Sequence, residues 1–491
     1  MKINCERCNH CAYYTHQLTR LKSPQLDPKW NIKMPKIKEE TRPSGAGLYM
    51  VFQDGSTKPA VVEVCNMSTI VMAGEILPIE DKFEKVVREL KIKELKLPED
   101  IIRKLLEIVK RRLAAFAYDD NDLRRTTLIV HTIKTGDAMP FKDRVRVVPL
   151  TLHDWLKGEL DRYLKADLIC EADHGKCPYA SAIVIVNKKD DFGTATDHRL
   201  CIDYRRLNAH TIKDAYPLPR IDDLLHQFGD SKYFSTTDML MGYNQIGMDP
   251  ADMYKTAFVT PFGFYMWKVM PFGLCNVPAT FQKFVDKLFS KYHDTKAYLD
   301  DVISHNADKL EHLKTIDRNL GIFIEANVVL KTRKCRYFCD RVPFVGYILS
   351  ADGIAADPRK IIRVLDWPFP KTGLGMLSFL GLCNYYRTLI DHFSDLASLL
   401  YDASRGDNIE MTPELLAAFD KLKGAMCAAP ILRTMDPKLP FILETDASNI
   451  AIGAVLKQKF EDGEFPIGYF SKSLTKTERN YSTYERESYM Q

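Results

Sequence analysis

Two adjacent aspartates, Asp300 and Asp301, stand between two short β-forming runs in the stretch 296–304. This pattern predicts a β-hairpin with both acids at its tip, where a tight turn can bring neighbouring side chains to one side of the sheet. Carboxylates on a rigid turn can ligate a hard cation such as Mg²⁺ and leave room for substrate phosphates. Taken alone, however, an Asp-Asp pair is more simply explained as a polar turn.

A third acid strengthens the case for a metal site. The run 233–238 is an apolar, β-branched strand that ends at Asp238. Three acids from two strands could hold two metal ions about 3.5–4 Å apart. Such a pair of ions activates an attacking 3′-oxygen and stabilises a leaving pyrophosphate. The acids that would carry this chemistry are Asp238, Asp300 and Asp301.

The same residues carry a resemblance to a known family. The segments Phe234–Asp238 and Tyr298–Asp301 resemble the two metal motifs in the palm of the reverse transcriptases of gypsy-type LTR retrotransposons, which are parts of a Pol polyprotein. The resemblance runs from about His131 to Gln491. It implies an α+β, right-hand polymerase with fingers, palm and thumb, followed by a truncated ribonuclease H-like α/β domain. The implied activity is RNA-directed DNA polymerisation.

The resemblance also implies cofactors and partners. Two Mg²⁺ ions would occupy the polymerase site, with Mn²⁺ as the alternative ion. The implied partners are an RNA template, a DNA primer or RNA–DNA hybrid, and deoxynucleoside triphosphates. Other Pol or Gag products are further expected partners, and no membrane is expected.

Length and composition fit this picture without establishing it. A chain of 491 residues predicts three or four domains, and its 46% hydrophobic and 27% charged residues are ordinary for a soluble protein. The net charge of +4 permits nucleic-acid binding but does not demonstrate it. The 12 scattered cysteines and the absence of a signal-peptide pattern predict a reducing, intracellular compartment. For an LTR retroelement product, the resemblance implies a cytoplasmic particle, the nucleus or both.

Changes of composition along the chain indicate where its segments begin and end, and the resemblance implies which parts of the polymerase they are. Near the N-terminus, Cys5, Cys8 and Cys11 form a dense cluster, but their spacing does not supply a convincing fourth zinc ligand. The expected segments are 1–45, a disordered lead; 46–80, a small β-rich spacer; 81–130, a helical linker; 131–350, fingers and palm; 351–435, thumb and connection helices; and 436–491, an incomplete ribonuclease H-like domain.

Basic residues in the expected fingers suit triphosphate binding. The resemblance places Arg199 on the triphosphate, helped by Lys188 or Lys189, because arginine and lysine neutralise phosphate charge. A solvated charged hairpin is the alternative. The loop 190–198 is longer than is usual in the family, so the choice between the two lysines stays open.

Three further positions follow from the resemblance. Tyr243, five residues after Asp238, matches the position that closes under the sugar, where a bulky ring excludes a 2′-hydroxyl. A core tyrosine is the alternative, and both can hold. Phe272 matches the loop under the incoming base. The predicted primer-grip residues are Val345, Gly346 and Tyr347.

The C-terminal segment predicts the start of a ribonuclease H fold. A strand at 441–446 ends at Asp446, two more strands follow at 450–458 and 466–473, and a helix begins near residue 480. Ser482 and Glu485 fit a capping box, which makes Glu487 the better metal-ligand candidate beside Asp446. Because the sequence stops inside that helix, no ribonuclease H activity is expected from this segment.

Two other functions remain open at this stage. One is a decayed or co-opted copy that binds nucleic acid without catalysis, although the three palm acids and Tyr243 argue against decay. The other is a DNA-templated polymerase, because both kinds of template use the same metal chemistry.

Overall fold

The computed structural model describes residues 48–51, 57–60, 82–189, 195–482 and 484–485. The chain divides into two compact units, Met1–Ile79 and Glu80–Gln491. In the described part of the first unit, β1 (Leu48–Val51) pairs antiparallel with β2 (Thr57–Ala60). The cluster formed by Cys5, Cys8 and Cys11 lies outside the described residues. No described helix has the length and apolar character needed to cross a lipid bilayer.

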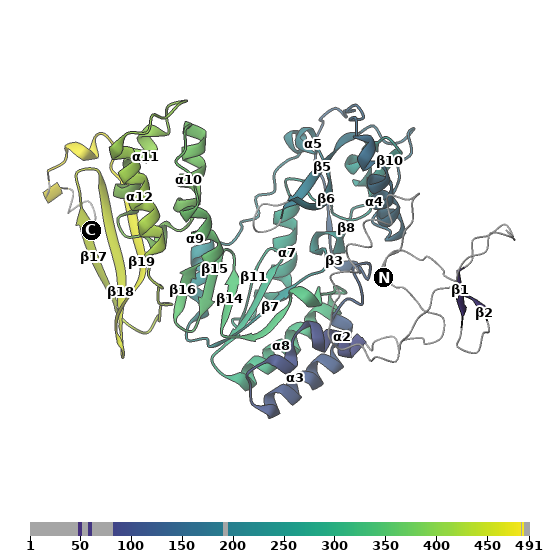
Figure 1. Cartoon of the computed structure of the whole chain (residues 1–491), viewed down its shortest axis with the longest axis horizontal. Helices are drawn as coiled ribbons and strands as arrows, with labels where there is room; N and C mark the ends of the chain where they lie inside the picture. Colours follow the sequence, from purple (N-terminus) through teal and green to yellow (C-terminus); the bar gives the residue numbers. More distant parts are fainter. Residues whose placement is uncertain (1–47, 52–56, 61–81, 190–194, 483, 486–491) are drawn as a thin grey trace. The chain divides into compact units, whose positions relative to one another are not determined.

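The centre of the second unit is a four-stranded antiparallel sheet in the order β11-β12-β7-β13 (Figure 1). Val302 and Ile303 of β12 are both fully buried although they point to opposite faces. Val302 joins the core formed with α7 and α8, and Ile303 joins a second core with Phe344. Burial on both faces continues through Ser304 and His305, so the middle of β12 is enclosed although only Val302 and Ile303 are apolar. The elements are β7 (Tyr233–Asp238), β11 (Thr295–Tyr298), β12 (Asp301–Asn306), β13 (Arg336–Cys339), α7 (Val277–Phe289) and α8 (Lys309–Glu325).

The helices before this sheet share its core. Leu105 is fully buried with the side chains of α7 and α8, and Arg112 donates to Asp317 of α8 at 2.8 Å. Farther along, Phe116 forms a β-bridge with Leu330, which leads into the loop before β13. The predicted helical segment is therefore packed on the sheet through an apolar face. It contains α2 (Lys82–Glu89) and α3 (Glu99–Arg111).

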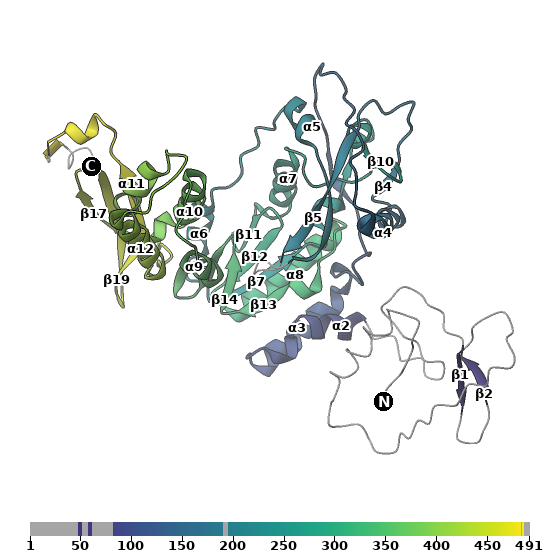
Figure 2. The same ribbon diagram turned by 45° about the horizontal axis from the view of Figure 1, so that its top comes forward.

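A second sheet, in the order β4-β10-β9-β5-β6, forms the expected fingers (Figure 2). Two hairpins build this sheet: β5 pairs with β6, and β9 pairs with β10. Helix α4 packs on this sheet, with the rings of Tyr163 and Trp267 5.3 Å apart. The elements are α4 (His153–Lys165), β4 (Ile169–Glu171), β5 (Ser181–Lys189), β6 (Ala195–Ile202), β9 (Phe258–Thr260) and β10 (Gly263–Trp267).

A small sheet, β14-β15-β16, leads from the palm into a group of helices. Asp357 caps the first of these helices, because it accepts a hydrogen bond from the backbone N–H of Arg359, and Pro358 is the first residue of α9. Phe379 and Phe419 pack in the core between these helices. The elements are β14 (Arg341–Phe344), β15 (Tyr347–Ser350), β16 (Gly353–Ala356), α9 (Pro358–Leu365), α10 (Gly373–Tyr385), α11 (Phe393–Ala403) and α12 (Pro413–Cys427).

The three predicted C-terminal strands are present, and they form an antiparallel sheet in the order β17-β18-β19. Strand β19 meets the helices through Ser471, whose hydroxyl accepts from the backbone N–H of Ser394 at 2.9 Å. Strand β17 is an edge strand with mostly exposed side chains. The strands are β17 (Phe441–Ala447), β18 (Ala451–Phe460) and β19 (Gly463–Ser473).

Candidate active site

The predicted acidic hairpin is present, with a two-residue loop. Tyr298 of β11 pairs with Asp301 of β12, so Leu299 and Asp300 form the loop between them. Leu299 has a φ of 53°, in the left-handed region that costs an L-residue roughly 1–2 kcal/mol. The turn is held from outside, because the Leu299 N–H donates to the side-chain oxygen of Gln282 at 2.8 Å. The backbone therefore adopts an unfavourable conformation to place Asp300 and Asp301 at the tip.

Gln282 is a supporting residue that sequence reasoning missed. It is fully buried on α7, and its amide nitrogen donates to Asp286 at 2.9 Å and to the carbonyl of Ala297 at 3.3 Å. A signal was available: Gln282 stands at the i and i+3 spacing with Val285, on the apolar face of the helix. A polar side chain on such a face needs buried partners, and the hairpin backbone provides them.

The third acid stands directly across the sheet from the hairpin. Asp238 is the last residue of β7 and the antiparallel register partner of Asp301. Opposite residues in such a ladder have Cβ atoms about 4.5–5.5 Å apart, so their charges interact strongly. Asp300, in the adjoining loop, is close enough to act electrostatically on both. The structure thus brings together all three predicted metal ligands at one end of the sheet.

At this end of the sheet, three carboxylates lie close enough for their like charges to repel one another. The loss of surrounding water raises the pKa of Asp301 to about 6, and the like charges of Asp300 and Asp238 add to the shift. Desolvation also raises the pKa of Asp238, against the opposing effect of a hydrogen bond from Lys334. For both acids, burial disfavours the charged form more than the neighbouring lysine favours it.

Lys334 is the second residue that the sequence did not reveal. Its Nζ lies 3.0 Å from Oδ2 of Asp238, with the ammonium end largely exposed. The loop that carries it is fixed to β7, because the N–H of Lys331 donates to the backbone carbonyl of Asp238 at 2.8 Å. A cavity of about 130 Å³ lies beside this pair and is also lined by Asp301 and Arg336.

The donor set can be compared with what a divalent ion requires. Three carboxylates at one sheet end supply the hard oxygen ligands that Mg²⁺ prefers. In the described part of the chain, however, no group of three or more Asp, Glu, His or Cys side chains stands close enough to hold one ion. The three carboxylates are chemically suited to Mg²⁺, but their oxygen atoms do not all face one position where an ion could bind.

Next to the acids lies an aromatic pair that matches the predicted nucleotide positions. The rings of Tyr243 and Phe272 are 4.9 Å apart, and Tyr243 also meets Phe281 of α7 edge-on at 4.9 Å. Burial raises the pKa of Tyr243 to about 12, with Asp300 contributing. Phe272 is 55% exposed, so its ring is open to a ligand. Tyr243 therefore packs in the core and also reaches the acidic end of the sheet.

Gly242 explains how Tyr243 reaches that position. A Cβ at Gly242 would lie 3.0 Å from the ring of Phe281, closer than side chains normally tolerate. Without a Cβ, the backbone can approach α7 and direct the next side chain over the same ring.

With this geometry described, the sequence comparisons can be interpreted. Residues 186–349, which include the acids, Tyr243, Phe272 and Lys334, match the family described as reverse transcriptase (RNA-dependent DNA polymerase). These residues form a reverse transcriptase domain. Residues 411–489 match the RNase H-like domain found in reverse transcriptase.

Relatives of the reverse transcriptase domain agree with this assignment. The chain is 36% identical to the retrovirus-related Pol polyprotein from transposon 297 of Drosophila melanogaster, over 74% of this chain and 34% of the relative. It is 33% identical to the Pol polyprotein from transposon gypsy of the same organism, over 81% of this chain and 39% of that one. The chain thus spans between a third and two fifths of these relatives.

Solved structures support the fold. The foamy viral protease-reverse transcriptase dRH in complex with double-stranded DNA superimposes with a TM-score of 0.74, at 22% identity, over 85% of this chain and 72% of that one. The same enzyme in complex with an RNA/DNA hybrid gives a TM-score of 0.71, over 87% and 55%. The right-hand polymerase fold with an RNase H-like domain is therefore confirmed.

The residues predicted to bind the triphosphate lie on the β5–β6 hairpin of the fingers. Arg199 is exposed on β6, opposite Val186 of β5. Lys188 and Lys189 end β5, but their side chains lie outside the described residues, as does the loop 190–194. The position of these lysines relative to a triphosphate stays a prediction.

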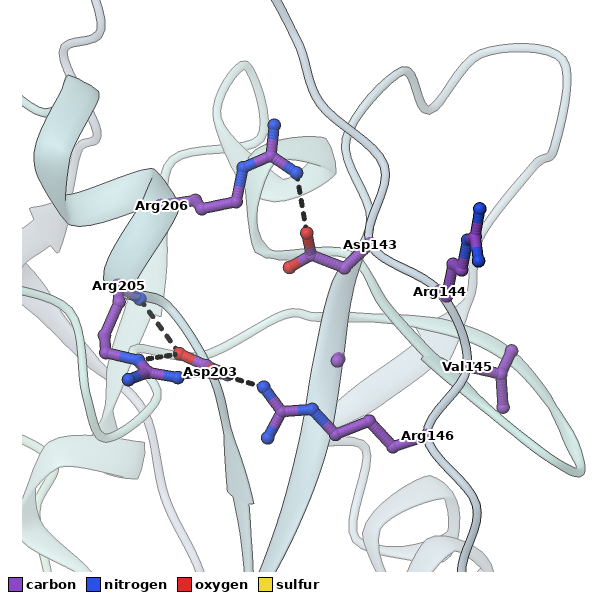
Figure 3. A pocket seen from close by; sticks show the side chains of 8 residues that line it. Asp143, Arg144, Val145, Arg146, Asp203, Arg205 and Arg206 are labelled. Atoms are coloured by element: carbon purple, nitrogen blue, oxygen red, sulfur yellow. Dashed lines mark hydrogen bonds and ion pairs between the residues drawn. The ribbon is translucent and has the colours of Figure 1, made fainter.

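A basic pocket at the base of the fingers was not predicted (Figure 3). It encloses about 520 Å³, and its charged side chains come from the segment 143–146 and from 203–206. Asp203 accepts from Arg205 at 2.7 Å and from Arg146, and these arginines hold the pKa of Asp203 well below its usual range. Arg206 donates to Asp143 at 2.7 Å. Four arginines against two aspartates leave the pocket with net positive charge: Arg144, Arg146, Arg205 and Arg206.

The predicted primer-grip residues form a tight hairpin turn between β14 and β15. Val345 and Gly346 both have positive φ, 45° and 78°, as a two-residue type I′ turn requires. Two hydroxyl groups from the end of α10 fix the turn, since Tyr385 donates to the Val345 carbonyl and Tyr386 to that of Gly346. Tyr347 donates back to the Tyr385 carbonyl at 2.8 Å.

In the RNase H-like region, the structure describes only one of the two predicted metal ligands, Asp446. Asp446 is exposed near the end of β17, with its carboxylate 3.9 Å from His392. The predicted capping box is confirmed: the Ser482 N–H donates to Glu485, and the Glu485 N–H donates to the Ser482 hydroxyl. Glu487 lies outside the described residues, so its predicted role as a partner of Asp446 stays a prediction.

Proposed function

We propose that this chain is an RNA-directed DNA polymerase that extends a primer 3′-end with deoxynucleotides, in the manner of an LTR retroelement Pol product. The observation that carries the proposal is the pairing of Asp301 with Asp238 across the sheet, with Asp300 in the adjoining turn. These acids stand beside an aromatic pair suited to a sugar and base, Tyr243 and Phe272.

The protein's part in the reaction is to position groups. Divalent ions held by Asp238, Asp300 and Asp301 would supply charge neutralisation for the primer 3′-oxygen and the pyrophosphate. Gln282 keeps the hairpin tip in its strained turn, so the carboxylates stay in place before substrate arrives. The Tyr243 ring, backed by Phe281, resists displacement and so would exclude a 2′-hydroxyl.

Nucleic-acid binding follows from the same arrangement. The foamy viral relative is described in complex with an RNA/DNA hybrid and with double-stranded DNA, which supports duplex binding by this chain. The primer-grip turn at Val345 and Gly346 is rigid enough to hold a primer strand near the acids. The basic pocket around Arg146 and Arg205 would take backbone phosphates on the fingers side.

Primer extension tests the proposal. The substrate is oligo(dT) annealed to poly(rA), with Mg²⁺ and dTTP, and the variants are Asp300→Asn and the matched control Asp340→Asn, an exposed aspartate between β13 and β14. We expect extension by the wild-type chain and by the control, and none by Asp300→Asn. Failure of the folded wild-type chain to extend a primer that it binds would contradict the polymerase and favour a nucleic-acid-binding protein.

A second template separates the two polymerase classes. The same primer on poly(dA) measures DNA-templated extension under identical conditions. Equal or greater use of poly(dA) at every primer concentration would contradict the assignment as an RNA-directed enzyme.

A further inference from the structure

The loop that carries Lys334 is held on two sides by ion pairs. Lys331 pairs with Asp120 at 3.1 Å, and Arg333 pairs with Glu89 of α2 at 2.9 Å. Lys334 points the other way, to Asp238. Three basic residues in four positions thus each meet an acid, and only Lys334 meets one that belongs to the proposed metal site.

The backbone of this loop is fixed, but the Lys334 side chain is free to swing. The Lys331 N–H bonds to the Asp238 carbonyl, and the Lys334 N–H bonds to the Lys331 carbonyl at 2.9 Å. The side chain of Lys334 is 60% exposed, so its ammonium can leave Asp238 for water at little cost. The backbone of Lys334 is therefore fixed by hydrogen bonds, while its exposed ammonium group can change position.

Among the described residues, Lys334 is the lysine that hydrogen-bonds to an acid at this end of the sheet, while Lys331 acts on Asp238 only through its charge. Oδ2 of Asp238 is occupied by Lys334, and the described side chains do not converge on a point where an ion could sit. The lone pair of Oδ2 that accepts from Lys334 is not available to an ion that approaches Asp238 from the same side.

We propose that Lys334 is an internal counter-cation that occupies Asp238 when no divalent ion is bound and withdraws when one enters. The proposal rests on the proposed function only in taking the palm acids as the metal site. Lys334 then sets how tightly this protein binds the ion. It is a positioning residue, since it acts through Asp238 and not on substrate.

The charge of Lys334 opposes metal binding in two ways. It must be displaced from Asp238, and once displaced it still repels a divalent ion a few ångströms away. Unit charges 4 Å apart interact by about 1 kcal/mol even at the dielectric constant of water, so its removal should tighten binding by roughly three- to ten-fold.

Manganese binding to the full chain, followed by the loss of the free Mn²⁺ electron paramagnetic resonance signal without nucleic acid, tests this directly. The variants are Lys334→Met, Lys334→Arg and the matched control Lys314→Met, which removes an exposed lysine paired with Glu311 on α8. We expect Lys334→Met to bind Mn²⁺ three- to ten-fold more tightly than wild type. Lys334→Arg and Lys314→Met should bind as wild type does.

The outcomes separate this inference from the polymerase proposal. If Asp300→Asn abolishes the measured site but Lys334→Met leaves its affinity unchanged or weaker, the role of Lys334 is wrong and the metal site stands. If Lys334→Arg binds as tightly as Lys334→Met, charge is not the cause and the inference also fails. If Asp300→Asn binds Mn²⁺ as wild type does, the palm is not the site and both proposals fail.

Discussion

The backbone N–H of Leu299 is bonded to the side-chain oxygen of Gln282, which reaches the acidic turn from a helix 17 residues earlier. One buried amide thereby holds a left-handed leucine in the loop that presents Asp300. This support is internal to the protein and does not depend on substrate.

Replacing Gln282 with Leu should therefore impair catalysis more than binding. The change leaves the Leu299 N–H without its acceptor, which costs roughly 1–3 kcal/mol of stability. A shift of the tip by about 1 Å can lower the extension rate by about 100-fold. Single-turnover extension and thermal unfolding measure the two effects. The control is Gln227→Leu, at an exposed position; a Gln282→Leu rate equal to that of the control would contradict the role of this contact.

Tyr243 should control the choice of sugar. Tyr243→Ala removes the ring that stands between Phe272 and Phe281, so a ribonucleotide should no longer be excluded. We expect the preference for dTTP over UTP on poly(rA), measured as a ratio of kcat/KM values, to fall by roughly 10- to 200-fold. Tyr243→Phe keeps the ring and should keep the preference. If a folded Tyr243→Ala protein still prefers dTTP over UTP as strongly as wild type does, Tyr243 serves only the packing of the core.

The raised pKa of Asp301 predicts how stability changes with pH in the absence of metal. Its value shifts from 3.8 to about 6, so between these limits the folded state binds more protons than the unfolded state. The contribution of Asp301 to stability therefore falls as pH rises from about 4 to about 6 and is constant above. After solvent screening, Asp301→Asn should gain on the order of 1 kcal/mol at pH 7.5 and little at pH 4.

Denaturant unfolding at these two pH values, in a chelating buffer, measures this difference. The same ionisation predicts that Mn²⁺ affinity rises with pH up to about 6 and then levels off, because only the carboxylate form is a ligand. A stability difference that is largest at pH 4 would have the wrong sign for a raised pKa.

The hydroxyl of Tyr386 should matter for primer positioning. Tyr386→Phe leaves the Gly346 carbonyl without its 2.7 Å donor in a half-buried turn, at a cost of about 1 kcal/mol. We expect a lower melting temperature and a lower extension rate at saturating primer–template. Tyr118→Phe, at an exposed position, is the control. An unchanged rate with a lowered melting temperature would restrict Tyr386 to a structural role.

The basic pocket should act through phosphate charge. Arg205→Gln removes one cation from it, so the dependence of log affinity on log salt concentration for an RNA–DNA hybrid should become shallower by about 0.7–0.9. Fluorescence anisotropy across a salt series measures this slope. Arg103→Gln, on the exposed side of α3, provides the same change of charge elsewhere. If the salt dependence of hybrid affinity has the same slope for both variants, the pocket is not part of the nucleic-acid interface.

The parts of the site that the sequence predicted are those encoded locally. The β-forming runs on either side of Asp300 and Asp301 specify a hairpin, and a strand ending at Asp238 specifies a third acid at a sheet end. The capping box at Ser482 and the cap at Asp357 were also predictable, because each uses residues at most three positions apart.

The missed contacts join residues far apart in the sequence. Lys334 lies 96 positions from Asp238, and Arg146 lies 57 from Asp203, so no local pattern links them. The left-handed Leu299 contradicts its own backbone preference, which is common where a chain holds functional groups.

The bridge between Phe116 and Leu330 has a consequence for how the polymerase part folds. A hydrogen bond from Leu330 to the Ala115 carbonyl and the burial of Leu105 make α3 part of the same cooperative unit as the palm sheet. A truncated chain beginning at His131 would keep all three acids yet expose the apolar surface that α3 covers. We expect such a fragment to aggregate or melt early, and one beginning before Lys82 to unfold in a single step with the palm.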